Sequence, residues 1–265
     1  MPSFSVIAII ACFAYAIESI FGFGGTIIFL GISGLIYDFE SLLKLAMIVG
    51  LSSGLAVLIQ SFKYLSFKHL GTILIYTIPG ALIGTTMITY LASGLLIKLF
   101  SIILILYGII NLFFPNIAIP KMIKKILLIL GGFIQGIYTV GGPFVLMGFK
   151  DNFSSKQELR STMAGYFFVI NSMRALFFLA LGGSYTTIVN AYYPIAFLVM
   201  ISVWLGYLVH TRIPELMFRK LIVIAITFLL LNIDIELQFF NCKPLLDLWI
   251  YVHILQKTKK KYNNL

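Results

Sequence analysis

Two glycine-bearing stretches interrupt apolar segments of this sequence and carry residue types that bind anions. They are FGFGGT, which begins at Phe21, and YTVGGP, which begins at Tyr138. A helix that starts after a chain break offers unpaired N–H groups and the positive end of its dipole, and this combination binds anions. Pro143 suits the first turn of such a helix because it lacks an N–H. We therefore expect two helix starts that face each other near the membrane midplane and hold one small anion. The candidate substrate-binding residues are Gly22, Gly24, Gly25, Thr26, Thr139, Gly141, Gly142, Pro143 and Arg174.

The composition indicates what kind of protein carries these stretches. Of 265 residues, 60% are apolar and only 11% charged, and the mean hydropathy is +1.04. The chain is therefore predicted to be an all-α polytopic membrane protein, in which each spanning helix needs about 20 apolar residues. Its net charge of +10 is expected to mark cytoplasmic loops and not a nucleic-acid partner.

The sequence shows no pattern typical of an enzyme. Cys12 and Cys242 stand alone, and the three histidines are far apart with no metal-ligand spacing. No ATP-binding motif or convergent nucleophile is present. We expect no catalytic residue, no metal and no cofactor.

The apolar segments are arranged as two similar halves. The first half, 1–116, and the second half, 117–231, each hold four segments, and a basic interfacial tail, 232–265, follows. With an offset of 117 residues, Glu18 corresponds to Gln135 and Gly24-Gly25 to Gly141-Gly142. Paired interruptions at matching positions are the best sequence indication of a transporter binding site. The eight segments cover about 4–37, 43–61, 70–91, 95–114, 123–150, 161–181, 187–209 and 214–231, and the first and fifth are interrupted.

Two topologies compete. If each interrupted segment crosses the membrane as one kinked helix, the repeats are parallel, and five cations lie on one side and eight on the other. If each is a re-entrant hairpin, the repeats are inverted, and one side holds only Lys44 and Lys98. The positive-inside rule favours the inverted arrangement. The other side then holds Lys63, Lys68, Lys121, Lys124, Lys125, Lys150, Lys156, Arg160, Arg212, Arg219 and Lys220.

The two motifs resemble those of the TauE/SafE family of sulfite and organosulfonate transporters. The resemblance rests on FGFGGTIIFLG in the first half and GGFIQGIYTVGGPFVLMGF in the second, and it extends over about residues 5–231. It implies a duplicated helical carrier in the cytoplasmic membrane. Thr26 departs from the family, which often has glycine there, and the tail after Leu231 has no counterpart in the family.

Two charged residues lie deep in apolar segments, where charge is costly and often functional. Glu18 either carries a coupling proton or only hydrogen-bonds the broken backbone. Arg174 either pairs with Glu18, holds a sulfonate through forked hydrogen bonds, or extends to the headgroups. Asn171, three residues before Arg174, faces the same side of the helix.

Together these patterns predict a secondary transporter, an exporter or permease, for small sulfur-containing anions such as sulfite or organosulfonates. Its partners would be that anion and the lipid bilayer, with proton or sodium coupling. A passive anion channel, a carrier of another organic anion and a scaffold without transport activity are the alternatives. The sequence leaves the exact substrate, the direction of transport and the oligomeric state open.

Overall fold

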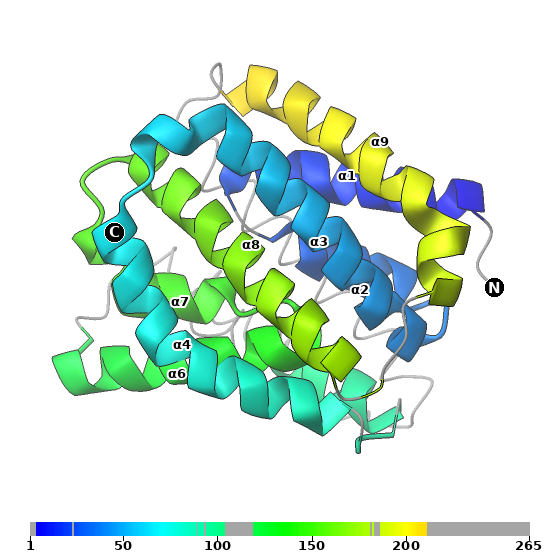
Figure 1. Ribbon diagram of the computed structural model, residues 1–265, viewed down its shortest axis with the longest axis horizontal. Coiled ribbons are helices and arrows are strands. Elements are labelled where there is room, and N and C mark those ends of the chain that lie inside the picture. The colour runs from blue at the N-terminus through cyan, green and yellow to red at the C-terminus, as the bar shows by residue number, and fades with distance from the viewer. Residues whose placement is uncertain are drawn as a thin grey trace, which may run out of the picture.

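The structure, a computed structural model, is a bundle of helices (Figure 1). It describes residues 4–22, 24–88, 90–92, 94–103, 119–180, 182 and 186–210. In these ranges every regular element is a helix, which confirms the all-α prediction there. The predicted segment 214–231 and the tail 232–265 lie outside the described residues. The helices are α1 (Phe4–Phe21), α2 (Gly25–Ser33), α3 (Phe39–Ser61), α4 (Phe67–Ile88), α6 (Lys121–Tyr138), α7 (Gly142–Phe149), α8 (Lys156–Ala180) and α9 (Thr186–His210), with short turns η1 (Phe62–Tyr64) and η2 (Lys150–Asn152).

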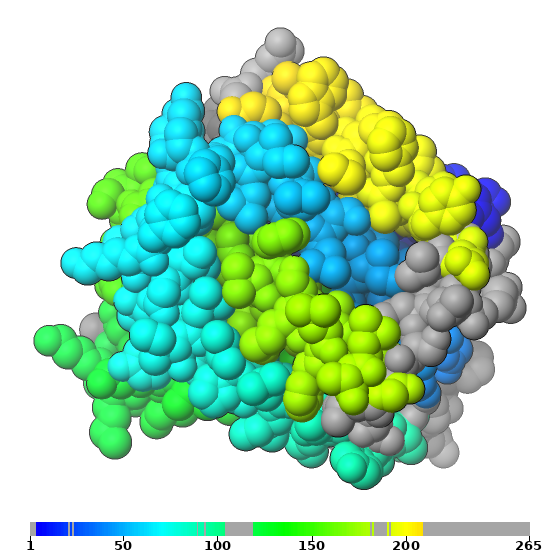
Figure 2. Space-filling view, viewed as in Figure 1, coloured from blue at the N-terminus to red at the C-terminus, as the bar shows by residue number. Residues whose placement is uncertain are grey.

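Three of the described helical stretches are long and apolar enough to cross a membrane: Phe39–Tyr64, Phe67–Ile88 and Lys156–Ala180. Shorter apolar helices cover Phe4–Ile20, Gly94–Ile103 and Tyr192–Leu208. Side chains of α3, α4, α8 and α9 cover the face in Figure 2, and large apolar groups on these helices are exposed, including Ile59 and Trp204. Such a surface suits lipid, so the membrane prediction is supported, while the full set of eight segments stays a prediction.

Both predicted interruptions are present. α1 ends at Phe21 and α2 begins at Gly25, and Gly24 between them has φ 98°. α6 ends at Tyr138, where Thr139 adopts the left-handed conformation with φ 62° and ψ 24°. Such a φ is accessible to glycine but rare for a β-branched residue. The backbone therefore changes direction at the two positions that the glycine motifs indicate.

The second broken segment turns back on itself. The Lys124 ammonium lies 2.6 Å from the Asp151 carboxylate, so η2, just after α7, returns to the start of α6. This hydrogen bond and charge hold the pKa of the exposed Asp151 carboxyl below its usual value. Gly148 also packs against the carbonyl of Lys124. The segment is thus a hairpin that begins and ends on one side of the bundle, and the single kinked crossing is wrong for it.

The first broken segment follows the same course from the opposite end. α1 and α9 run in the same direction, because Cys12 contacts Ser202 and, one turn further on, Ala16 contacts Gly206. Both helices therefore start near the end of α8. α3 also starts there, since Lys44 lies over the ring of Phe178, 6.0 Å from its centroid. α1 and α2 thus begin and end on the same side.

This arrangement separates the cations. The start of α4 meets the start of α8 through His69 and Glu158, whose Nδ1 and Oε1 atoms are 2.8 Å apart. Lys125 of α6 lies over the ring of Tyr76 in α4. The described cations at this end are Lys63, Lys68, Lys121, Lys124, Lys125, Lys150, Lys156 and Arg160. Lys44 and Lys98 lie at the opposite end, as the hairpin arrangement requires.

The start of α8 is held by hydrogen bonds between side chains and backbone. The N–H of Glu158 donates to Ser155 Oγ at 3.1 Å, and the N–H of Ser154 donates to Glu158 Oε2 at 2.9 Å. These reciprocal bonds satisfy N–H groups that the first helical turn leaves unpaired.

One helix of each predicted half packs against a helix of the other predicted half. α4 packs on α6, and α9 packs on α1, while α3 and α8 lie antiparallel through the centre (Figure 1). The α4–α6 contact depends on small residues that let the backbones approach closely. A Cβ atom added at Gly132 would collide with the Thr77 carbonyl, and one added at Gly136 with that of Ala81.

We expect Gly132→Ala to destabilise the protein by roughly 1–3 kcal/mol, the usual cost of overpacking. The new methyl meets backbone and no flexible side chain can yield. Thermal unfolding in detergent measures the effect. Gly71→Ala in α4 is the matched control, because nothing lies within 4 Å of an added Cβ there. Equal stability of the two variants would contradict this packing.

Candidate functional site

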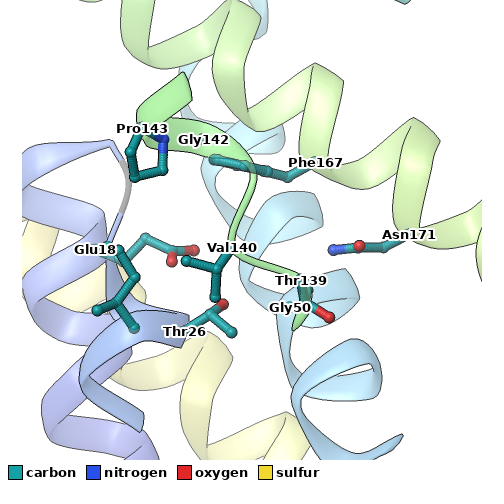
Figure 3. Close-up of a pocket in the computed structure, with 11 residues that line it drawn as sticks. Glu18, Thr26, Gly50, Thr139, Val140, Gly142, Pro143, Phe167 and Asn171 are labelled. Carbon is teal, nitrogen blue, oxygen red and sulfur yellow. The ribbon is translucent and has the colours of Figure 1, made fainter. Parts of the chain in front are cut away.

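A pocket lies where the two broken segments approach each other (Figure 3). Residues from both breaks line it, together with residues of the central helices α3 and α8. The glycine motifs, 117 residues apart in sequence, therefore share one site, as their pairing predicts. The lining residues are Glu18, Gly24, Thr26, Ile27, Gly50, Thr139, Val140, Gly142, Pro143, Phe167 and Asn171.

The two breaks are held by corresponding hydrogen bonds. In the first half, the Gly25 N–H donates to Glu18 Oε2 at 3.0 Å, and Ser53 Oγ donates to Glu18 Oε1 at 2.9 Å. In the second half, the Gly141 N–H donates to Gln135 Oε1 at 2.7 Å. Gln135 Nε2 in turn donates to Asn171 Oδ1 at 3.0 Å. Glu18 and Gln135 thus perform the same structural task, one with a carboxylate and one with a neutral amide.

These bonds change the predicted roles of two glycines. The N–H groups of Gly25 and Gly141 were expected to bind the anion, but side chains already accept from them. Both glycines serve close packing instead. A Cβ at Gly25 would lie 2.7 Å from the Cβ of Glu18, and one at Gly141 would collide with the Gly131 carbonyl. Neither residue lines the pocket.

Arg174 lies inside the protein, behind the pocket wall. Its side chain is 2% exposed, so the interpretation that it extends to the headgroups is wrong. Its Nη1 donates to Thr139 Oγ1 at 2.8 Å and to Asn171 Oδ1 at 3.4 Å. Among the described residues, no Arg174 nitrogen lies within 4 Å of the Glu18 carboxylate. Arg174 therefore holds two lining residues in place through hydrogen bonds and does not itself line the pocket.

The first hairpin has its own buried arginine. Arg160 Nε donates to the carbonyl of Ser19, at the end of α1, at 3.0 Å. Its Nη2 donates to Gln60 Oε1, and the guanidinium lies over the ring of Tyr207. A cation suits the negative end of a helix dipole. Gly22, a predicted site residue with φ 82°, packs against Arg160 and not against the pocket.

The structure brings some of the predicted site residues to one pocket and leaves others outside it. Gly24, Thr26, Thr139, Gly142 and Pro143 line the pocket with Glu18, whereas Gly22, Gly25, Gly141 and Arg174 support it from outside. Thr26 Oγ1 lies 3.1 Å from the hydroxyl of Tyr15. Sequence reasoning missed Gly50 and Asn171 as lining residues. Asn171 was marked only by its spacing from Arg174, and Gly50 had no local signal.

The family described as Sulfite exporter TauE/SafE matches residues 7–233 of the chain. The chain belongs to the TauE/SafE family. This TauE/SafE protein is therefore a membrane transporter of the sulfite-exporter type and not an enzyme. Neither the curated proteins nor the solved structures include a match to it. Within the described residues, no group of three or more His, Cys, Asp or Glu side chains is placed to hold a metal.

The correspondence between Glu18 and Gln135 predicts how this TauE/SafE protein tolerates substitution. We expect Glu18→Gln to fold with nearly unchanged stability, because an amide oxygen already caps the other break. Glu18→Ala would leave the Gly25 N–H and the Ser53 hydroxyl without a partner, at a cost of about 1–3 kcal/mol. Melting temperatures in detergent compare the variants, and a Gln variant as unstable as the Ala variant would refute the correspondence.

Proposed function

We propose that this protein is a secondary transporter of sulfite, organosulfonates or similar small oxyanions across the cytoplasmic membrane. One observation carries the proposal: the two broken segments contribute backbone, hydroxyls and a carboxylate to a single buried pocket. Non-helical backbone at membrane depth is tolerated where it is buried in protein or lines a cavity. The lysine-rich end would face the cytoplasm under the positive-inside rule.

The proposed coupling residue is Glu18. Glu18 lines the pocket and is 8% exposed, and among the described residues no cation lies within 4 Å of its carboxylate. The charged or titratable groups around it are Tyr15 on its own helix, Arg160 beyond Ser19 and Arg174 across the pocket. An anion entering the pocket would meet like charge unless Glu18 carries a proton. Proton and anion would then move together.

Access would alternate by motion of two mixed bundles. The exchange of helices joins α1 and α2 to α9, and α6 and α7 to α4, around the central pair α3 and α8. Motion of one repeat against the other would pull apart the close α4–α6 and α1–α9 contacts. Each hairpin is therefore proposed to move with the helix that packs on it from the other half. Inverted repeats of this kind bind substrate at the repeat interface.

Flux through proteoliposomes tests the function. We expect saturable uptake of sulfite or a sulfonate, faster than uptake of a carboxylate of similar size, and stimulation by a proton gradient. Glu18→Gln should keep anion exchange but lose that stimulation, because the amide cannot carry a proton. Equal, unsaturable leakage of all anions would favour a passive channel. Stimulation that survives in Glu18→Gln would remove Glu18 from the coupling.

Cross-linking tests the moving bundles. With Cys242 replaced by Ser, we expect a bond between Cys12 and Ser202→Cys, within one bundle, to leave flux above about half of the uncross-linked value. A bond between Ser66→Cys and Thr162→Cys should abolish it, because Ser66 precedes α4 and its N–H donates to Thr162 of the central α8. The same variants without oxidation are the controls. Flux that survives the second bond would contradict the proposed motion.

A further inference from the structure

We propose that the anion binds on the wall formed by the end of α6 and by α8, where the Asn171 amide and the Thr139 hydroxyl are its donors. Arg174 orients both groups and acts as a positioning residue. This inference rests on the proposed transport function and names the binding groups within the pocket. It replaces the predicted role of the Gly25 and Gly141 N–H groups, which the structure shows to be occupied.

The orientation of the Asn171 amide follows from its neighbours. Its Oδ1 accepts from Gln135 Nε2 at 3.0 Å and from Arg174 Nη1 at 3.4 Å. Both neighbours are donors, so the oxygen must face them and the Nδ2 group must face away. Asn171 is 1% exposed and lines the pocket, and the nitrogen of its amide points into it in Figure 3. Among the described residues, Nδ2 has no hydrogen-bond partner.

The Thr139 hydroxyl is constrained in the same way. Its oxygen accepts from Arg174 Nη1 at 2.8 Å, so its proton is available to a ligand. The residue is 4% exposed and holds a left-handed backbone conformation. Strained conformations of this kind persist where the surroundings enforce them, and they cluster at ligand sites. Here the conformation places the hydroxyl both against Arg174 and on the pocket wall.

The two donors define the chemistry of the ligand. Both groups can donate to a ligand, and a group that only accepts hydrogen bonds complements them. A small oxyanion with at least two oxygens can accept from both donors, and the Arg174 charge behind the wall favours it. Gly50 limits the size, because a Cβ added there would lie 3.1 Å from Asn171 Nδ2. Glu18 is held by Ser53 and Gly25 and contributes no donor as a carboxylate.

Asn171→Asp tests the inference sharply. An aspartate keeps the oxygen that accepts from Gln135 and Arg174, so the fold should survive, but it exchanges the Nδ2 donor for a negative acceptor. We expect sulfite flux to fall by at least about tenfold, in line with loss of a hydrogen bond to a charged group, and sulfite to stop raising the melting temperature. Asn152→Asp in the exposed turn η2 is the matched control and should transport as the unchanged protein does.

The outcomes separate the two proposals. If the unchanged protein carries none of the anions, the transport function itself fails. If it carries sulfite and Asn171→Asp does so equally well, Asn171 is not a donor to the substrate and the inference is overturned. If Asn171→Asp does not fold, comparison of Thr139→Val with Thr139→Ser tests the inference instead. Both alter the side chain, but only Val removes the hydroxyl, so sulfite KM should rise at least about fivefold more in Thr139→Val. Equal KM values would overturn the inference.

Discussion

The structure depends on how it satisfies backbone that leaves helical pairing in an apolar interior. Each break leaves N–H groups inside the protein without helical partners. Glu18 and Gln135 close the two breaks from the last turns of α1 and α6 by accepting from Gly25 and Gly141. Ser53 and Asn171, on the central helices α3 and α8, then fix these two side chains. The hairpin tips are thereby tied to the centre of the bundle.

The two caps differ in charge, and this difference distinguishes a structural role from a chemical one. Because Gln135 caps its break without charge, the charge of Glu18 is not needed for capping. A carboxylate at this position inside a membrane protein is costly, and this cost points to a task beyond the fold. The first break thus has a cap that can bind a proton, and the second has a cap that cannot.

Two buried arginines on α8 fill a similar pair of places, one at each hairpin tip. Arg160 binds the carbonyl of Ser19 at the end of α1, and Arg174 binds the hydroxyl of Thr139 at the end of α6. α3, the partner of α8 in the centre, supplies no buried cation within its described length. Among the described residues, the buried positive charge therefore comes from one helix, which also carries Asn171 on the pocket wall. We infer that α8 gives the site its preference for anions.

The local sequence determined where the two broken segments are interrupted and at which end of the bundle most cations lie. Glycines at Gly22 and Gly24 permit positive φ, and the lysines near segment ends mark one side, so both features follow from residue type and spacing. The partners of Arg174, the packing roles of Gly25 and Gly141, and the amide of Asn171 could not be predicted in this way. Each depends on helices that are distant in sequence and meet only when α4 and α9 exchange between the halves. Tertiary structure alone decides which donors are already used and which remain free for a ligand, because a hydrogen bond needs both of its partners in place.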